Sequence, residues 1–229
     1  HYEHPSQYEG GVLLRYHPEW RTAESLGIPV KREGLQTMIM DQQRQLLYFV
    51  TWPKKQFVRY DLRTRETTNF GVIAWSPTDE SGRKQHYARD LFIDHDGVVY
   101  CTNNFGEIVY LAPGDDHLTE TSLVIREGDS LRTHLRRSDG TFYLCTSQGH
   151  LLHFDPAEFA VTYLGPTTPR QAVYTPNLLL SEDEKELVYL AGSHGSYAEG
   201  GMQLVSFDLQ GRTHVRHGFL HEALSPAYC

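Results

Sequence analysis

The sequence predicts an all-β protein, and two observations carry that prediction. Short apolar or alternating runs separated by Gly, Asp and Asn are frequent, whereas helical periodicity is nearly absent. One pattern also recurs, in which an aromatic residue lies in a strand-like run and a glycine follows 11 positions later. Small antiparallel sheets repeated along a chain are typical of a β-propeller. The four copies are Tyr16 to Gly27, Tyr60 to Gly71, Phe154 to Gly165 and Phe207 to Gly218.

A fifth copy keeps the strand at Leu111 but has Ser122 in place of the glycine. The copies fall at positions 16, 60, 111, 154 and 207, so one unit recurs every 43 to 53 residues. Asp-Gly pairs at 96–97 and 139–140 predict tight hairpins inside two units, because glycine supplies the positive φ of such turns. The acidic run 183–186 is also predicted to be a hairpin turn. Several hairpins per unit indicate four-stranded blades.

We expect a single β-propeller domain over residues 1–229, with four complete blades and one partial blade. Known propellers have roughly four to eight blades, and unpaired strand edges are usually avoided. The chain is therefore expected to be a piece of a six- or seven-bladed ring, with a closed five-bladed ring as the alternative. The partial blade covers about 1–27, and the complete blades cover about 35–71, 87–125, 131–165 and 172–218.

Composition narrows the classes of partner. The chain of 229 residues has 21 Lys and Arg against 29 Asp and Glu, a formal charge of -8, which argues against a general nucleic-acid binder. No apolar run approaches the roughly 18 residues that would cross a bilayer, so no membrane span is expected. Cys101 and Cys145 are predicted to be buried thiols and Cys229 a terminal one, with a structural disulfide as the alternative. The sequence leaves the cofactor and the compartment unknown.

Two arginines occupy matching positions near the start of neighbouring predicted inner strands. In an antiparallel blade, the connections that precede these strands lie on the face where propeller ligands generally bind. Arg89 and Arg132 are therefore candidate substrate-binding residues, because a guanidinium group binds a carboxylate or sulfate in a bidentate manner. The alternative is a structural role, in which Arg89 pairs with Asp90, Asp94 or an adjacent blade, and Arg132 pairs with Asp129.

An aromatic residue and two lysines are expected on the same face, in the loop between the second and third strands of one blade. Trp52 could stack on a sugar ring, and Lys54 and Lys55 would attract acidic substituents. Arg83 and Lys84, in the long connection 72–88, would add to the positive charge. A local cationic surface on an acidic protein suggests an anionic sugar or another small anionic ligand. The alternative is an ordinary exposed hairpin with solubilising charge.

Two His-Tyr pairs are candidate catalytic residues. His194 and Tyr197 lie in a glycine-rich loop, and the same order of His, Tyr and Glu-Gly-Gly recurs at 4–11. His86 and Tyr87 are adjacent in the long connection before another blade. A histidine can accept a proton near neutral pH and a tyrosine can donate one, so each pair suits acid–base work. The alternative is that the two rings only stack within their loops.

Thirteen histidines raise the question of a metal. His4, His86, His134 and His194 could converge from different blades, but these four share no HxH or HxxxH spacing, so no metal site is predicted. Other histidines fall on predicted turns or outer strands and are expected to face solvent. These are His95, His117, His150, His153, His214 and His217.

Two pairs of segments resemble bacterial seven-bladed propellers. Residues 47–53 followed by 57–62 are similar to a repeat that reads approximately LYG.T.P...F..YD, and 138–140 followed by 150–156 to one that reads DG.IYG.T..G.LFRFDPET. Propeller-type polysaccharide lyases, which act on ulvan or oligogalacturonate, are similar in architecture. Their sites combine His, Tyr and Arg, sometimes with a metal. The resemblance is structural and implies a propeller fold with a carbohydrate as ligand.

Three functions therefore remain open. The first is β-elimination from an acidic polysaccharide, and the second is a non-catalytic propeller that binds a sugar or a protein. The third is a lactonase of the gluconolactonase type, which needs carboxylate and amide metal ligands such as Asp90. For elimination, Arg89 and Arg132 would neutralise the uronate carboxylate, His194 or His86 would take the proton, and Tyr197 or Tyr87 would donate one.

Overall fold

A computed structural model describes residues 7–73, 88–103, 105–168, 175–192 and 202–219 of the chain. Its described residues form strands, turns and connections but no helix, so none of them makes a long apolar helix that could cross a membrane. The strands pair only antiparallel. The predicted all-β class of four-stranded antiparallel sheets is confirmed.

Five sheets follow one another in chain order, the first with two strands and each later one with four. In every four-stranded sheet the strands pair in sequence order. The first sheet holds β1 (Leu13–His17) and β2 (Thr22–Gly27), and the second holds β3 (Gly34–Asp41), β4 (Leu46–Trp52), β5 (Gln56–Asp61) and β6 (Thr67–Val72). The third holds β7 (Phe92–Ile93), β8 (Val99–Thr102), β9 (Glu107–Leu111) and β10 (Thr119–Val124). The fourth holds β11 (Leu131–Arg136), β12 (Phe142–Thr146), β13 (His150–Asp155) and β14 (Ala160–Pro166). The fifth holds β15 (Leu179–Leu180), β16 (Glu186–Ala191), β17 (Gln203–Asp208) and β18 (Thr213–Phe219).

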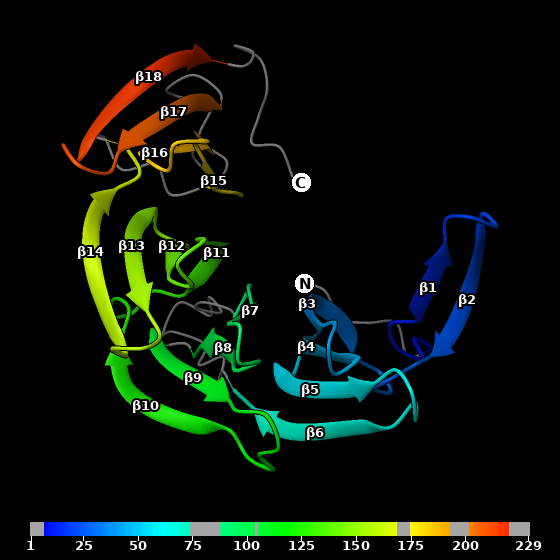
Figure 1. The fold of residues 1–229 in the computed structure, drawn as a ribbon. Coiled ribbons are helices and arrows are strands. Elements are labelled where there is room, and N and C mark those ends of the chain that lie inside the picture. The colour runs from blue at the N-terminus through cyan, green and yellow to red at the C-terminus, as the bar shows by residue number, and fades with distance from the viewer. Residues whose placement is uncertain (1–6, 74–87, 104, 169–174, 193–201, 220–229) are drawn as a thin grey trace.

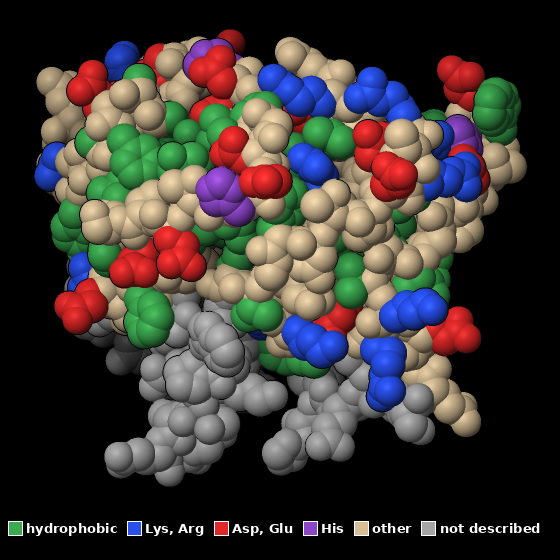
Figure 2. Space-filling view, turned by 90° about the horizontal axis from the view of Figure 1, so that it is seen from below, with side chains coloured by type: hydrophobic (Ala, Val, Ile, Leu, Met, Phe, Trp, Pro, Cys, Tyr) green, Lys and Arg blue, Asp and Glu red, His purple; other side chains and the backbone are tan. Residues whose placement is uncertain are grey.

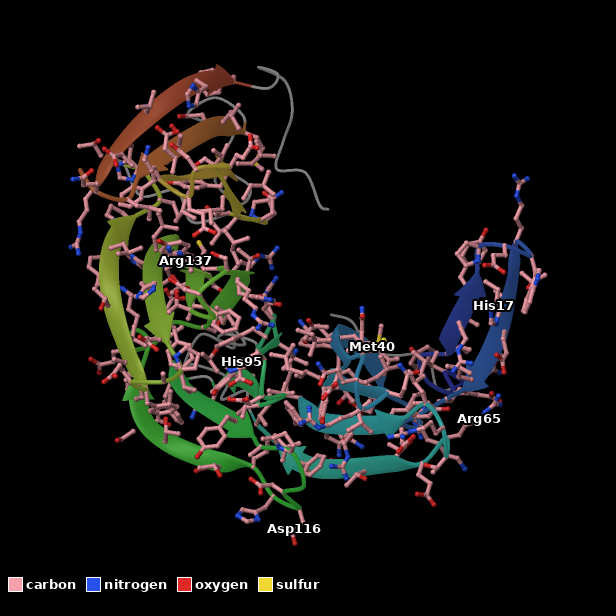
Figure 3. The ribbon with its side chains drawn as sticks, viewed as in Figure 1. His17, Met40, Arg65, His95, Asp116 and Arg137 are labelled. Atoms are coloured by element: carbon pink, nitrogen blue, oxygen red, sulfur yellow. The ribbon has the colours of Figure 1, made fainter. Side chains whose placement is uncertain are left out.

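The sheets are arranged as blades along an arc around a common middle (Figure 1). The first strand of each complete blade, β3, β7, β11 or β15, lies toward the middle, and the last, β6, β10, β14 or β18, lies at the outside. Figure 3 shows the same polarity in side chains, with Met40 of β3 toward the middle and Arg65 and Asp116 at the outer rim. The single-domain division and the predicted closure into a larger ring stay predictions.

Apolar side chains fill the spaces between successive blades. Tyr48 and Phe57 of the second blade pack with Leu91 and Val99 of the third in one buried cluster. Similar clusters join the first blade to the second, the third to the fourth and the fourth to the fifth. Because the second, third and fourth sheets are covered on both faces by their neighbours, their second strands are almost continuously apolar. The core of this protein is thus a series of interfaces between blades.

The glycine that ends each repeat has a physical reason. Gly27, Gly71, Gly165 and Gly218 all have positive φ, between +94° and +146°. Each lies where the pairing of the two outermost strands shifts register. Such a bulge places a residue in a conformation that favours glycine. The repeat that revealed the fold is therefore a bulge that bends each outer strand.

Hydrogen bonds also join the blades. The hydroxyl of Tyr60 donates to the Leu26 carbonyl (2.9 Å), and the Leu131 amide donates to Thr102 Oγ1 (2.9 Å). At the opposite end of the inner strands, Arg137 of the fourth blade, labelled in Figure 3, pairs with Glu184 of the fifth (3.1 Å). These contacts fix neighbouring blades relative to one another.

Three further sequence predictions can be compared with the structure. Residues 182–185 form the turn between β15 and β16, as predicted for this acidic run. Cys101 and Cys145 are buried free thiols, also as predicted, whereas Cys229 lies outside the described residues. His150 was expected to face solvent and this prediction is wrong, because its side chain is 5% exposed at the start of β13. The outer strand β14 covers it.

Candidate functional site

The candidate site lies at the end of the blades where the inner strands begin. We call this end the mouth. Each second strand ends there beside the start of the first, as the pairs Gly34–Trp52 and Leu131–Thr146 show. The mouth therefore includes the connections that enter β3, β7 and β11 and the loops that leave β4, β8 and β12. Its charged and aromatic residues used below are Glu33, Trp52, Lys54, Lys55, Arg89, Asp90, Asp129, Arg132 and His134.

The two predicted arginines enter the mouth from neighbouring blades. Arg89 lies in the extended segment just before β7, and Arg132 is the second residue of β11. Both are partly buried. Arg132 occupies a bulge, because the register of β11 with β12 shifts between Leu131 and Thr133. A bulge redirects the side chain of its extra residue. The same shift in β3 places Gln36 at the equivalent position.

A contact between Asp90 and His134 joins β11 to the segment just before β7. The Nδ1 atom of His134 lies 2.6 Å from Asp90 Oδ2, and the Leu91 amide donates to Asp90 Oδ1 (3.0 Å). The side chains are 25% and 18% exposed, respectively. The ring of His134 lies near Phe92 and Phe142, with centroids 5.7 and 6.3 Å away. Asp90, considered in the sequence as an ion-pair partner for Arg89 or a metal ligand, thus holds an imidazole.

The two predicted substrate-binding residues of the second blade, Trp52 and Lys54, lie at the end of β4 and in the loop after it. Trp52 is partly buried, and the ammonium of Lys55 lies 3.6 Å from the centre of its ring. Lys55 is only 1% exposed and donates to Gln36 Oε1. Lys54 is 64% exposed and its ammonium lies 3.6 Å from Glu33. Of the two lysines, Lys55 is therefore the one that packs against the tryptophan, a distinction that the sequence does not make.

Buried carboxylates hold the loops of the mouth in place. Glu33 accepts the backbone amide of Lys54 (3.0 Å), and Asp129 accepts the backbone amide of Gln148 (3.2 Å). Glu33 directly precedes β3 and Asp129 lies two residues before β11, and both side chains are almost fully buried. Each carboxylate thus connects the entry of an inner strand to the loop of the same blade. The sequence offers only a weak signal for this role. In both blades the acid lies two residues before the first apolar residue of the inner strand.

A second histidine lies behind the mouth. His150 Nδ1 is 3.2 Å from the Tyr163 hydroxyl, whereas His150 Nε2 and Asp129 Oδ2 are buried with no hydrogen-bond partner among the described residues. Burial, together with the charge of Arg126, lowers the pKa of His150 from its ordinary value, although Asp129 opposes this shift. His150 is therefore kept neutral by its surroundings.

The two buried thiols are not suited to nucleophilic chemistry. Burial raises the pKa of Cys101 and of Cys145 to about 12. The reactive form of a cysteine is the thiolate, which is scarce at neutral pH when the pKa is this high. Both side chains instead contribute to the apolar clusters between blades.

Several predicted site residues lie outside the described residues. Within the described part of the chain, no group of three or more His, Cys, Asp and Glu side chains is placed to hold a metal ion. Of the four histidines considered as metal ligands, His134 is described, and it pairs with Asp90. The predicted residues outside the description are His4, Arg83, Lys84, His86, Tyr87, His194 and Tyr197.

Charged side chains of both signs lie on the outer surface. Figure 2 shows acidic and basic side chains side by side over this face. Arg65 and Glu24, for example, form an ion pair that joins the outer parts of two blades. Interspersed charges of both signs suit a solvated surface.

Comparison with solved structures supports the fold. A Pseudomonas aeruginosa periplasmic gluconolactonase aligns with a TM-score of 0.60 at 11% identity, over 89% of this chain and 61% of its own. A putative 6-phosphogluconolactonase from Bacteroides fragilis aligns at 0.56 and 12%, over 90% and 63%. The hydrazine synthase of Kuenenia stuttgartiensis aligns at 0.58 and 16%, over 80% and 49%.

These similarities define a class of protein rather than a family. No protein-family model matches the chain, and no curated protein matches it either. The chain spans about half to two thirds of the length of the three solved structures. At such low identities the likeness concerns the fold, so this chain has the β-propeller architecture.

Proposed function

We propose that this β-propeller binds an acidic sugar at the mouth and acts on it. The contact between Asp90 and His134 carries the proposal, because it joins β11, on which Arg132 lies, to the segment before β7 that holds Arg89. Arginine recognises a planar carboxylate through two parallel hydrogen bonds. The site thus combines carboxylate recognition with a group able to move a proton.

The fold comparisons add support for a sugar ligand. Two of the neighbours are named for sugar lactones, a gluconolactonase and a putative 6-phosphogluconolactonase. Trp52 adds an aromatic surface at the edge of the mouth, with Lys55 against its ring. An aromatic ring beside cations suits a ligand with both an apolar sugar face and a negative group.

The reaction that we propose first is β-elimination from a hexuronate. The arginines would neutralise the uronate carboxylate and so lower the free energy of the charge that develops when the adjacent C–H bond breaks. His194 with Tyr197, or His86 with Tyr87, remain candidates for the acid–base steps from the sequence. Hydrolysis of a sugar lactone is a second candidate, and it is favoured by an imidazole at the mouth that could activate water.

Calorimetric titration tests the binding proposal. Oligogalacturonate should bind the wild-type protein, and the uncharged methyl ester of the same oligomer should bind much more weakly. Arg132→Ala should lower the affinity about tenfold or more, since a hydrogen bond to a charged group contributes about 1.5–3 kcal/mol. Arg136→Ala is the matched control, because Arg136 is exposed on the same strand away from the mouth. Equal binding of the charged and esterified oligomers would refute the proposal.

Turnover separates the enzyme from a binding module. An unsaturated uronate absorbs in the ultraviolet, so elimination appears as a rise in absorbance when a uronate polymer is added. Acid release from an aldonolactone reports hydrolysis. Tight binding of the oligomer with neither signal would leave a sugar-binding propeller without catalytic function.

A further inference from the structure

We propose that His134 is the proton-transfer residue of the mouth and that Asp90 is the residue that positions it. The inference rests on the proposed function, because it names a catalytic group for the same acidic-sugar site. It differs from the candidates that the sequence suggests, which are His194, Tyr197, His86 and Tyr87.

The hydrogen bonds of Asp90 fix the tautomer of His134. An ionised carboxylate only accepts hydrogen bonds, so the 2.6 Å contact requires His134 Nδ1 to donate. The other oxygen of Asp90 accepts the Leu91 amide at 3.0 Å, which holds the carboxylate in place from the backbone. In the neutral imidazole the proton is then on Nδ1 and the lone pair is on Nε2. A base oriented by a third group is a recurring arrangement in catalytic sites.

The surroundings of His134 leave Nε2 available. Its side chain is 25% exposed, and Nε2 has no hydrogen-bond partner among the residues that the structure describes. Phe92 and Phe142 lie near the ring and restrict its tilt. Arg132 precedes His134 by two residues, and Arg89 is adjacent to Asp90. The arginines proposed to hold the carboxylate are thus next to the Asp90–His134 pair along the chain.

The blade architecture does not require a histidine at this position. β3 and β11 share the same bulge and the same pairing pattern with their partners, so Met38 occupies the position equivalent to His134. Met38 is half exposed and pairs opposite Phe49, as His134 does opposite Leu144. Since the fold accepts a methionine at the equivalent position, the histidine of β11 is better explained by a functional role than by packing.

Nε2 of His134 can both take and return the proton that elimination requires. The lone pair of His134 Nε2 takes the proton from C5 of the uronate, and the electron pair of that C–H bond becomes the C4–C5 double bond. The bond from C4 to the glycosidic oxygen breaks, and the oxygen leaves with its electron pair. The imidazolium, stabilised by Asp90, then returns the proton to that oxygen, so the histidine ends neutral.

His134→Asn tests the proposal directly. The amide nitrogen of Asn can keep the hydrogen bond to Asp90, while the basic Nε2 is lost. We expect unchanged affinity for oligogalacturonate and a kcat at least about 100-fold lower, the usual contribution of a general acid–base group. His95→Asn is the control, because His95 is exposed on a turn at the opposite end of β7. Wild-type kcat in a folded His134→Asn protein would overturn the proposal.

Asp90→Asn tests the positioning role. The Asn side chain has one acceptor oxygen, whereas the Leu91 amide and His134 Nδ1–H both donate to Asp90. The tautomer of His134 with its proton on Nδ1 is therefore less stabilised. We expect a fall in kcat with little change in KM. Nitrogen NMR of labelled histidine supplies a measurement that a structural ion pair would not reproduce. In the wild-type protein the neutral imidazole of His134 should carry its proton on Nδ1, and in Asp90→Asn this proton should shift toward Nε2.

The outcomes separate the two proposals. Absence of any binding by the wild-type protein would refute the acidic-sugar site, whereas binding without turnover would overturn only the role of His134. A His134 ring that carries protons on both nitrogens throughout the neutral range would also overturn that role, because such a ring cannot accept a proton.

Discussion

His134 on β11 and His150 on β13 belong to the same blade but differ in access to water. His134 is a quarter exposed at the mouth, whereas His150 is nearly covered beside Tyr163. Burial disfavours the charged form of an imidazole, which is why the pKa of His150 is lowered. His134 is thus partly open to solvent at the mouth, whereas the imidazole of His150 is covered within the fold.

The lowered pKa of His150 predicts how stability depends on pH. When the folded-state pKa lies below the unfolded value of about 6.5, the unfolded chain binds more protons as the pH falls. The free energy of unfolding should therefore be highest above pH 6.5 and should decrease as the pH is lowered toward the folded-state pKa. His153, whose pKa is also lowered by burial, should contribute in the same direction.

Urea denaturation at pH 7.5 and pH 5.5 measures this effect. We expect His150→Gln to lose less stability between these pH values than the wild-type protein, since the variant has no proton to bind at that position. His95→Gln should behave like the wild type, because His95 is exposed. An unchanged pH dependence in His150→Gln would show that His150 titrates normally in the folded state.

At the scale of an element, the loop between β8 and β9 supports the mouth through a glycine. Gly106 has a φ of +82°, and a Cβ at this position would lie 2.1 Å from the Arg126 carbonyl and 2.8 Å from the Asp129 carbonyl. These carbonyls belong to the connection that enters β11. The loop and the connection also exchange hydrogen bonds, from Ile125 to Gly106 (2.8 Å) and from Gly128 to Phe105 (3.3 Å).

Gly106→Ala should therefore disturb the entry to β11. Gly114→Ala is the matched control, since Gly114 has a φ of +92° but open space around its Cβ position. We expect the control to lose about 1 kcal/mol of unfolding free energy, from the left-handed backbone alone. Gly106→Ala should lose several kcal/mol of unfolding free energy, because the added Cβ would force the packed backbone at Arg126 and Asp129 to move. Equal losses in urea denaturation would mean that the close approach does not exist.

The repeated elements were predictable from the sequence because each has a local cause. The glycine 11 positions after each aromatic residue marks a bulge, and the Asp-Gly pairs mark hairpins, so both are visible without tertiary contacts. In the third blade, Ser122 replaces the glycine, and the pairing of β10 with β9 is interrupted between Glu120 and Val124. The outer strand of the third blade thus also has an irregular pairing, although no glycine stands at the matching position.

The site was predicted less completely, for a reason that also applies to other propellers. Arg89 and Arg132 could be matched because both precede inner strands in aligned repeats. The pairing of Asp90 with His134 spans 44 residues and depends on how two blades meet. Lys55 was not separated from Lys54, because the turn geometry determines which of the two is buried. Contacts between blades have no sequence spacing that reveals them.

At the scale of the whole molecule, net charge and local charge act in opposite directions on an anionic ligand. The chain carries a formal charge of -8, while Arg89 and Arg132 place positive charge at the proposed site. Salt screens charges beyond about 10 Å at 0.1 M, so distant carboxylates weigh less than nearby guanidinium groups. We therefore expect attraction by the nearby guanidinium groups to outweigh repulsion by the net charge, so that an anionic ligand binds at physiological salt.

Titration of oligogalacturonate at several salt concentrations tests this balance. Affinity should fall several-fold between about 0.1 M and 0.5 M NaCl, because the arginine contacts are screened more strongly as the Debye length shortens. The fall should be smaller in Arg132→Ala, which lacks one of these charges. An affinity that rises with salt would mean that repulsion by the net charge dominates.

A crystal structure of the protein with a bound hexuronate oligomer would test the acidic-sugar site most directly. Our account predicts a sugar carboxylate within hydrogen-bond distance of the guanidinium group of Arg89 or Arg132, with a C5 atom facing Nε2 of His134. Sugar density along the outer strands, with these three side chains free of ligand, would contradict it.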